Sequence, residues 1–166
     1  LGKLFLLLAL ALSLLIPVMQ LAGRQHRSIQ YLWGINLTLL SAAFLSLIYC
    51  FAVSDFSVLN VWNNSHTSKP LLYKITGAWG NHEGSMLLWL LAICTFSTAF
   101  AVFAKGDAPV IKITLIVQSL LLACFIFFVI VASNPFERLF PAPINGQGLN
   151  PILQDIGLAF DPPMLY

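Results

Sequence analysis

Residues 4–22 read LFLLLALALSLLIPVMQLA and contain no charged side chain. A helix rises about 1.5 Å per residue, so about 20 apolar residues cross a hydrocarbon layer about 30 Å thick. Three further uncharged windows of similar or greater length follow, at 29–54, 84–104 and 113–132. The pattern predicts an all-α fold, a polytopic membrane helix bundle with four transmembrane helices. We expect a fifth helix to begin near Pro163.

The composition agrees with a membrane protein. Of the 166 residues, 59% are apolar and 8% are charged, whereas a soluble domain carries about 25% charged residues. A formal net charge of +2 without any basic run argues against nucleic acid as a partner. The chain begins with Leu1 and ends at Tyr166 within an apolar motif, so we expect a single transmembrane domain, residues 1–166, that is a fragment of a larger protein.

A cleaved signal peptide is an alternative for the first window, because Lys3 precedes its apolar run. The run is longer than a typical signal core, and no A-x-A cleavage site follows it. A membrane span is therefore the favoured interpretation.

Connections of two lengths join the windows. Residues 23–28 and 105–112 are short, whereas 55–83 and 133–162 are long. Four spans place both short connections on one side of the membrane and both long ones on the other. Each side has four basic residues, but the short connections hold theirs close to helix ends and contain a single acid, Asp107. By the positive-inside tendency, we expect the short connections in the cytoplasm and the long loops at the outer face.

The three cysteines, Cys50, Cys94 and Cys124, lie in long apolar stretches and form no CxxC pair. This pattern predicts packing residues and supports neither a disulfide framework nor a metal site.

The second window contains small or polar residues at every fourth position: Gly34, Thr38, Ala42, Ser46, Cys50 and Ser54. Such a row predicts close packing of another helix. Asn36 and Gln118 are expected to face protein, because an unpaired amide in hydrocarbon is costly.

The long loops carry five motifs. They are VWNNSH at 61–66, WGNHEGSMLLW at 79–89, NPF at 134–136, LNPILQD at 149–155 and PPMLY at 162–166. The Pro and Asn content favours fixed turns over helix. Because the loops are apolar and rich in Trp and Pro, we expect them to pack on each other as one ordered unit.

Segment 79–89 is the strongest candidate for a site. The His82 imidazole could ligate haem iron, and the Trp79 ring could lie against a porphyrin face. If the third helix begins near Gly80, Glu83 could hold the loop through backbone donors at the helix start. The alternative is that all three residues only fix the loop. The sequence contains no Walker A, GxGxxG, HExxH or GxSxG motif, so the catalytic residues are unknown.

In this order, the motifs resemble segments of the CcmF-type haem lyase subunits of the cytochrome c maturation family, namely V-x-N-N-S, WGxHEGSxLLW, SNPF, LNPLLQD and HPPLLY. The resemblance covers nearly the whole chain and corresponds to the N-terminal part of such a subunit. The NrfE-type paralogue that serves nitrite reductase assembly shares these segments. The remaining motif residues that carry the resemblance are Trp62, Asn63, Asn64, Gly84, Asn134, Pro135, Asn150, Pro151, Gln154, Asp155, Pro162 and Pro163.

The resemblance implies cytochrome c-type biogenesis at the outer face of the bacterial inner membrane, or of the mitochondrial one. The family takes haem from the chaperone CcmE and attaches it covalently to apocytochrome c. The implied partners are membrane lipid, CcmE, a CcmH-type subunit that handles apocytochrome, and apocytochrome c itself. The Trp-rich WWD haem-handling domain lies beyond the region present here, so the fragment lacks the central chemistry and whether it is an enzyme stays open.

One position departs from the family. A histidine precedes the Pro-Pro segment in the family, and Asp161 stands there in this chain. A carboxylate is a poor substitute for imidazole on haem iron, so Asp161 is not assigned as a ligand. A diverged copy, a sequence error and a ligand supplied elsewhere are the three explanations.

Two other classes of protein compete with a haem lyase component. A transporter fragment would place ionisable residues inside its helices, and none of the four windows contains one. A non-catalytic assembly subunit stays open, and a WWD segment downstream in the parent protein would separate it from a lyase component.

Overall fold

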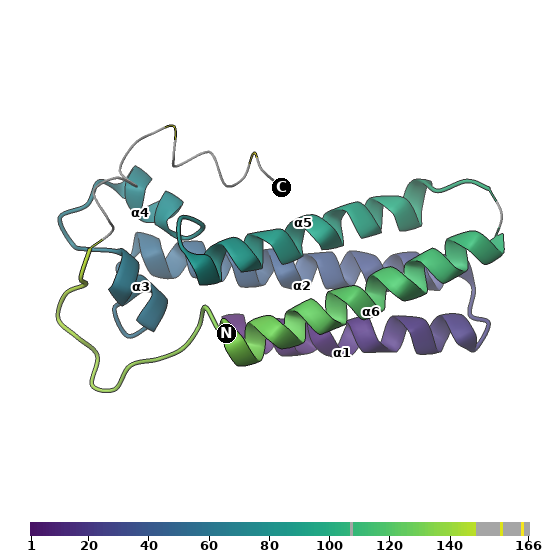
Figure 1. The fold of residues 1–166 in the computed structure, drawn as a ribbon, viewed down its shortest axis with the longest axis horizontal. Coiled ribbons are helices and arrows are strands. Elements are labelled where there is room, and N and C mark those ends of the chain that lie inside the picture. Colours follow the sequence, from purple (N-terminus) through teal and green to yellow (C-terminus); the bar gives the residue numbers. More distant parts are fainter. Residues whose placement is uncertain (107, 149–156, 158–163, 165–166) are drawn as a thin grey trace.

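The computed structural model describes residues 1–106, 108–148, 157 and 164. Four long helices run side by side along one axis (Figure 1): α1 (Gly2–Leu21), α2 (His26–Ala52), α5 (His82–Phe103) and α6 (Ala108–Ala132). Helices α1 and α5 each pack on both α2 and α6, so the four helices form a closed ring. All four are long and apolar enough to cross a membrane, which confirms the predicted four-span bundle. The predicted start of a fifth helix lies outside the described residues.

Each long helix begins two to five residues before the uncharged window that predicts it. The first turns contain charged residues, for example Lys3 in α1 and Lys112 in α6. Such side chains extend along the helix toward the membrane surface while the backbone stays helical. The window therefore measures the apolar layer, and the helix extends beyond it.

Two short helices lie in the first long loop, α3 (Leu59–Asn64) and α4 (Leu71–Gly77). The prediction of turns in place of helix is wrong for these segments. Asn64 ends α3, and its Nδ2 donates to the Asn60 backbone oxygen at 2.9 Å. Pro70 precedes α4 as its N-cap residue. Asn and Pro are thus compatible with helix ends, where they do not interrupt the backbone hydrogen bonds.

The ends of the bundle differ. Figure 1 shows the two short connections at one end, and α3, α4 and the segment after α6 at the other. The prediction that the two short connections lie together at one end, and the two long loops at the other, is therefore confirmed for the described residues. Gly23 follows the C-cap residue of α1 and has a φ of 73°, a backbone conformation that favours glycine. The amides of Gly23 and Arg24 bond the carbonyls of Gln20 and Met19, as in a Schellman motif.

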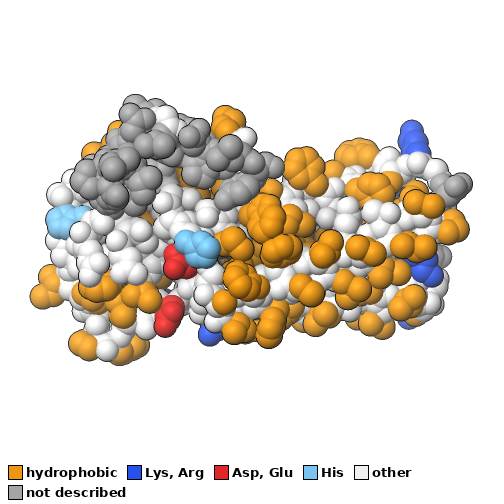
Figure 2. Space-filling model, in the orientation of Figure 1, with side chains coloured by type: hydrophobic (Ala, Val, Ile, Leu, Met, Phe, Trp, Pro, Cys, Tyr) orange, Lys and Arg blue, Asp and Glu red, His pale blue; other side chains and the backbone are white. Residues whose placement is uncertain are grey.

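Each long helix buries one stripe and exposes the rest of its apolar surface. Trp33, Leu40 and Leu47 of α2 are fully buried. Figure 2 shows apolar side chains over the flank of the long helices, with charged ones near their ends. An apolar flank between polar ends matches a bilayer.

Polar contacts inside the bundle join α1 to α2. Asn36 is fully buried, and its Nδ2 donates to Ser13 Oγ at 2.8 Å, while that hydroxyl donates to the Ala9 oxygen. Gln118 is half-buried, and its Oε1 is shielded from solvent. Both amides therefore face protein, as the sequence predicts.

The row of small residues on α2 does not form one continuous packing face in the described chain. Thr38 is exposed, and a Cβ added to Gly34 would meet nothing within 4 Å. Each step of four residues turns about 40° beyond one full turn, so the six positions wind around the helix. The packing prediction is therefore wrong for Gly34 and Thr38, whereas Cys50 at the other end of the row packs against the core.

The cysteines differ in burial. Cys94 is buried, Cys50 is half-buried and Cys124 is exposed on α6, and all three are free. The prediction of a packing residue is therefore right for Cys94 and wrong for Cys124.

Candidate functional site

Two segments far apart in the sequence meet at the loop end of the bundle. We call residues 55–81 and 133–148 together the loop platform. Val58 and Arg138 form an antiparallel bridge, in which the Leu59 amide donates to the Glu137 oxygen and the Leu139 amide donates to the Ser57 oxygen, both at 2.8 Å. The predicted packing of one long loop on the other therefore holds for the described residues.

The far end of the second segment is held to the end of α3. The Gln147 amide donates to the Trp62 oxygen at 2.8 Å, and the Gly148 amide donates to the Ser65 oxygen at 3.1 Å. Asn145 Nδ2 lies 2.9 Å from His66 Nε2. These contacts fix His66 within the loop platform and occupy one of its ring nitrogens.

The start of α5 is built by Asn81. Its Oδ1 accepts a hydrogen bond from the Gly84 amide at 2.8 Å, and its Nδ2 donates to the Gly77 oxygen at 2.6 Å. Asn81 is therefore both the N-cap of α5 and a link to the end of α4. The pattern of an Asn just before a helix could have identified this cap from the sequence.

Gly84 allows α5 to approach α4 closely. A Cβ at this position would lie 1.7 Å from the Ala78 backbone oxygen, a distance that no side chain tolerates. The motif glycine is therefore explained by backbone packing.

Trp79 and His82 differ in their burial. The Trp79 ring is half-buried and packs against the core, with its centroid 6.2 Å from that of Phe44 on α2. His82 is exposed at the first position of α5. The helix begins at His82, two residues after the predicted start, so Trp79 lies outside it.

Glu83 is half-exposed in the first turn of α5. Among the described residues its carboxylate has no hydrogen-bond or ion-pair partner, so the predicted role of holding the loop belongs to Asn81. An acid in a first turn still interacts favourably with the helix dipole.

The other motif residues have mostly structural positions. Trp62 is half-buried on α3, next to the exposed Asn63. Asn134 Oδ1 accepts from the Phe136 amide at 3.0 Å, which fixes the turn after α6 around the buried Pro135. The motif residues that lie outside the described part of the chain are Asn150, Pro151, Gln154, Asp155, Asp161, Pro162 and Pro163.

One amine in the loop platform is perturbed. Lys69 Nζ donates to the Asn64 oxygen at 3.1 Å, and burial lowers the pKa of Lys69 to about 8. Desolvation disfavours the charged ammonium, which explains the direction. The sequence does not predict this lowered pKa, because a single lysine in a loop gives no indication of its burial.

A cavity of about 760 Å³ lies where α1, α2 and α6 meet the loop platform. Its lining includes Lys3, Asp55, Glu137 and Arg138. Arg138 is held by a 2.7 Å hydrogen bond to Ser57 Oγ. The sequence does not predict this cluster, because its members are scattered charges from three segments.

Haem requires an iron ligand and an apolar slot for the porphyrin. In the described part of the chain, no group of three or more His, Cys, Asp or Glu residues could hold a metal ion. His82 supplies an exposed imidazole, but neither it nor Trp79 lines the 760 Å³ cavity. The described residues therefore place His82 and Trp79 outside this cavity.

The fold and the ordered loop end define a class, the polytopic helical membrane proteins. The profile of the cytochrome c assembly protein family matches residues 79–166, more than half of the chain. The chain therefore belongs to this family.

Two bacterial relatives cover the whole chain. The cytochrome c-type biogenesis protein CycK of Rhizobium meliloti is 48% identical over 100% of this chain and 26% of its own length. The cytochrome c-type biogenesis protein NrfE of Haemophilus influenzae is 40% identical over 100% of this chain and 27% of its own length. The chain thus spans about a quarter of the length of these relatives.

A solved structure titled cytochrome c heme lyase CcmF has the same fold, with a TM-score of 0.75 and 30% sequence identity. The match covers 82% of this chain and 24% of that chain. Together, the four spans and the bacterial relatives identify a multi-pass inner-membrane protein.

Proposed function

We propose that the chain is the N-terminal membrane part of a cytochrome c-type biogenesis subunit of the CcmF haem lyase class. The observation that carries this proposal is the match of the cytochrome c assembly family to residues 79–166, the segment that begins at the loop platform and continues through α5 and α6. Relatives named for cytochrome c biogenesis cover the whole chain, and a CcmF structure matches four fifths of it.

In the parent protein, haem is the cargo and apocytochrome c is the acceptor. Haem arrives from a CcmE-type chaperone, and a CcmH-type subunit presents the apocytochrome. The loop platform lies at the outer face and serves as a docking surface for the haem chaperone and the apocytochrome. The gathering of the motif-bearing loops at one end of the bundle supports this role.

Next to the loop platform, at the first position of α5, His82 contacts the haem or its chaperone, whereas Asn81 and Gly84 are structural. Of the three histidines, His66 bonds Asn145, and His26 bonds the Ala101 oxygen on α5. His82 is exposed beside the loops and keeps its imidazole accessible. Trp79 supports the site from the core side, since its ring packs against Phe44.

Expression of the full-length parent in a strain that lacks CcmF tests this function. Covalently bound haem in c-type cytochromes is measured per unit of parent protein. The parent should restore cytochrome c, and His82→Ala should lower the haem signal at unchanged abundance. Glu83→Gln is the matched control, because the neighbouring carboxylate has no partner in the described structure, and it should restore cytochrome c as the parent does.

Two results would count against the proposal. If His82→Ala changes nothing, or lowers only abundance, the contact role is wrong. If the parent itself restores no cytochrome c, the assignment of the chain to the CcmF haem lyase class is wrong.

The NrfE class is a second candidate, because the NrfE of Haemophilus influenzae is 40% identical over the whole chain. The same expression in a strain that lacks NrfE separates the two. If the parent rescues the strain that lacks NrfE and not the strain that lacks CcmF, the chain is assigned to the nitrite reductase assembly paralogue.

A further inference from the structure

A second cavity, of about 490 Å³, opens at the short-connection end of the bundle, opposite the loop platform. The ends of all four long helices contribute to it. Gln20 lies in the last turn of α1, His26 begins α2, Ala104 caps α5 and Ile111 lies in the first turn of α6. The volume is within the range of about 300–1,000 Å³ that is typical of small-ligand sites.

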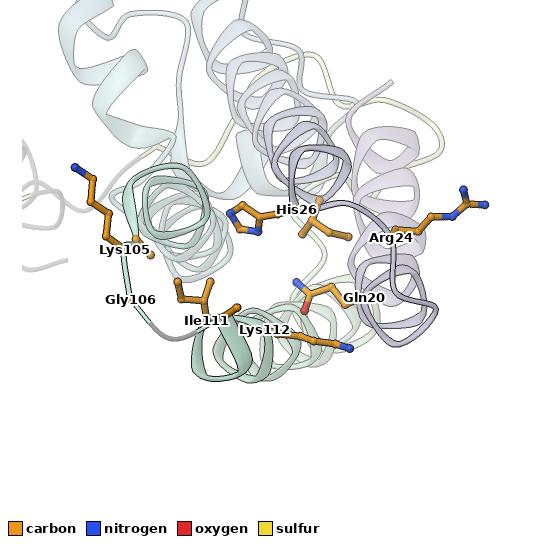
Figure 3. A pocket seen from close by; sticks show the side chains of 10 residues that line it. Gln20, Arg24, His26, Lys105, Gly106, Ile111 and Lys112 are labelled. Atoms are coloured by element: carbon orange, nitrogen blue, oxygen red, sulfur yellow. The ribbon is translucent and has the colours of Figure 1, made fainter.

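Gln20 is the buried polar group of this cavity. Its side chain is 5% exposed, and its Oε1 has no hydrogen-bond partner among the described residues. Figure 3 shows the Gln20 amide directed into the same space as His26 and Ile111. An unpaired buried acceptor is costly, so a ligand that donates a hydrogen bond to Gln20 Oε1 would satisfy it.

Basic side chains surround the mouth of the cavity. Arg24, Lys105 and Lys112 line it and are exposed. Figure 3 shows the charged ends of Arg24 and Lys105 directed away from the cavity, while Lys112 runs along its edge. These long, flexible side chains provide positive charge at the rim without filling the interior.

Two helix N-termini add positive potential at the same end. Helices α2 and α6 both begin here, and neither has an acid in its first turn. Gln25, the N-cap residue of α2, makes no capping hydrogen bond through its side chain. The positive ends of both helix dipoles therefore favour an anion near the cavity, although Asp107, which directly precedes α6 in the sequence, offsets part of this charge.

Part of the cavity lining is apolar. Ile29 and Ile111 line the cavity, and Val18 and Leu21, in the last turns of α1, are exposed on the flank. A ligand with a polar head and hydrocarbon chains could place its head in the cavity and its chains along this flank.

We propose that the cavity binds the headgroup of an anionic phospholipid that carries hydroxyl groups, of the phosphatidylglycerol type. A phosphate oxygen accepts from Gln20 Nε2 and meets the rim cations, and a headgroup hydroxyl donates to Gln20 Oε1. Basic pockets between helix ends commonly recognise such headgroups. The site is separate from the loop platform and does not depend on the proposed function.

The test uses the full-length parent protein in mild detergent and native mass spectrometry. The protein is incubated with phosphatidylglycerol, with phosphatidylcholine or with phosphatidylglycerol plus inorganic phosphate, and the retained lipid is counted. Phosphatidylglycerol should be retained, phosphatidylcholine should not, and inorganic phosphate should not displace the lipid.

The variants locate the site. Gln20→Met, which keeps the side-chain volume, and the double variant Lys105→Gln/Lys112→Gln should each lower retention about tenfold. Lys3→Gln, which removes a cation at the opposite end, should leave retention unchanged. If Gln20→Met does not fold, the double variant decides the question.

Three outcomes would overturn the proposal. Equal retention by the parent and the double variant would place the lipid elsewhere. Complete displacement by inorganic phosphate would indicate a site for a free anion. Failure of the full-length protein to retain phosphatidylglycerol would show that something else, such as another segment of the parent, fills the cavity.

Discussion

Single residues in segment 79–84 have separable roles. Gly84 permits the approach of the Ala78 backbone oxygen, Asn81 caps α5, and His82 is left exposed. The residues that build the segment thus flank the exposed imidazole of His82. A substitution can therefore remove structure or contact without removing both.

Gly84→Ala should destabilise the parent protein by about 1–3 kcal/mol, because its Cβ would overlap the Ala78 oxygen at 1.7 Å. The melting temperature of the purified parent in detergent measures the loss. Gly34→Ala is the matched control, since its Cβ meets nothing within 4 Å and alanine favours a helix by about 0.5–1 kcal/mol. Equal losses at the two positions would contradict the close contact between α4 and α5.

Lys69 should show a pH-dependent reactivity set by its lowered pKa. The pKa of Lys69 in the folded protein is about 8, below its ordinary value of 10.5. As pH rises, Lys69 therefore loses its proton at a lower pH in the folded protein than in the unfolded one. Stability contributed by Lys69 therefore increases as pH rises from about 8 toward 10.5, and the burial penalty is fully present below 8.

Acylation of Lys69, followed by peptide mass spectrometry, measures this pKa directly. The rate should level off just above pH 8 in the folded parent, and it should keep rising toward pH 10 in the denatured protein. A folded-state rate that still rises tenfold per pH unit between pH 9 and 10 would contradict the burial of the amine.

For single residues, the sequence predicts that segment 79–84 is important, but it assigns the backbone donors at the helix start to Glu83 and not to Asn81. Residue types alone suggest a carboxylate as the group that satisfies backbone donors, and the helix start decides which residue can reach them. Because α5 begins at His82, Asn81 occupies the capping position and Glu83 does not. Likewise, aromatic composition cannot reveal that the Trp79 ring packs inward against Phe44.

At the scale of elements, the link between α4 and α5 depends on both polar atoms of Asn81. Asn81→Ala removes the cap and the bond to the Gly77 oxygen, whereas Asn81→Asp keeps only the acceptor. The alanine variant should cost about 1–2 kcal/mol, and the aspartate variant should cost less.

Melting of the two variants under the same conditions gives the order of stability. Parent, then Asn81→Asp, then Asn81→Ala is the expected order. An alanine variant as stable as the parent would show that the cap contributes nothing to the loop platform.

The long helices are predictable because hydrocarbon thickness sets their length, and each uncharged window is long enough to span it. Helices α3 and α4 are missed because six or seven residues give too little periodicity. Their helical state comes from tertiary contacts, such as the buried Asn60 and Val61 of α3.

At the scale of the whole molecule, an apolar bundle joins two ends of different structure. The loop platform gathers residues more than seventy positions apart, such as Ser57 and Arg138. The other end surrounds the Gln20 cavity with basic side chains. The lengths of the connections predict that the two ends differ, but the pairing of the loop segments and the cavity arise only from packing.

The placement of the loop platform at the outer face is the central claim, because cytochrome c assembly is proposed there. Cysteine accessibility in spheroplasts tests it, with a membrane-impermeant maleimide and the three native cysteines replaced by serine. Ser68→Cys lies on the exposed part of the loop platform, and Ala108→Cys lies exposed at the start of α6. Ser68→Cys should react in intact spheroplasts, and Ala108→Cys should react only after permeabilisation. If only Ala108→Cys is labelled in intact spheroplasts, the orientation of the protein in the membrane is the reverse of the one proposed, and the account is contradicted.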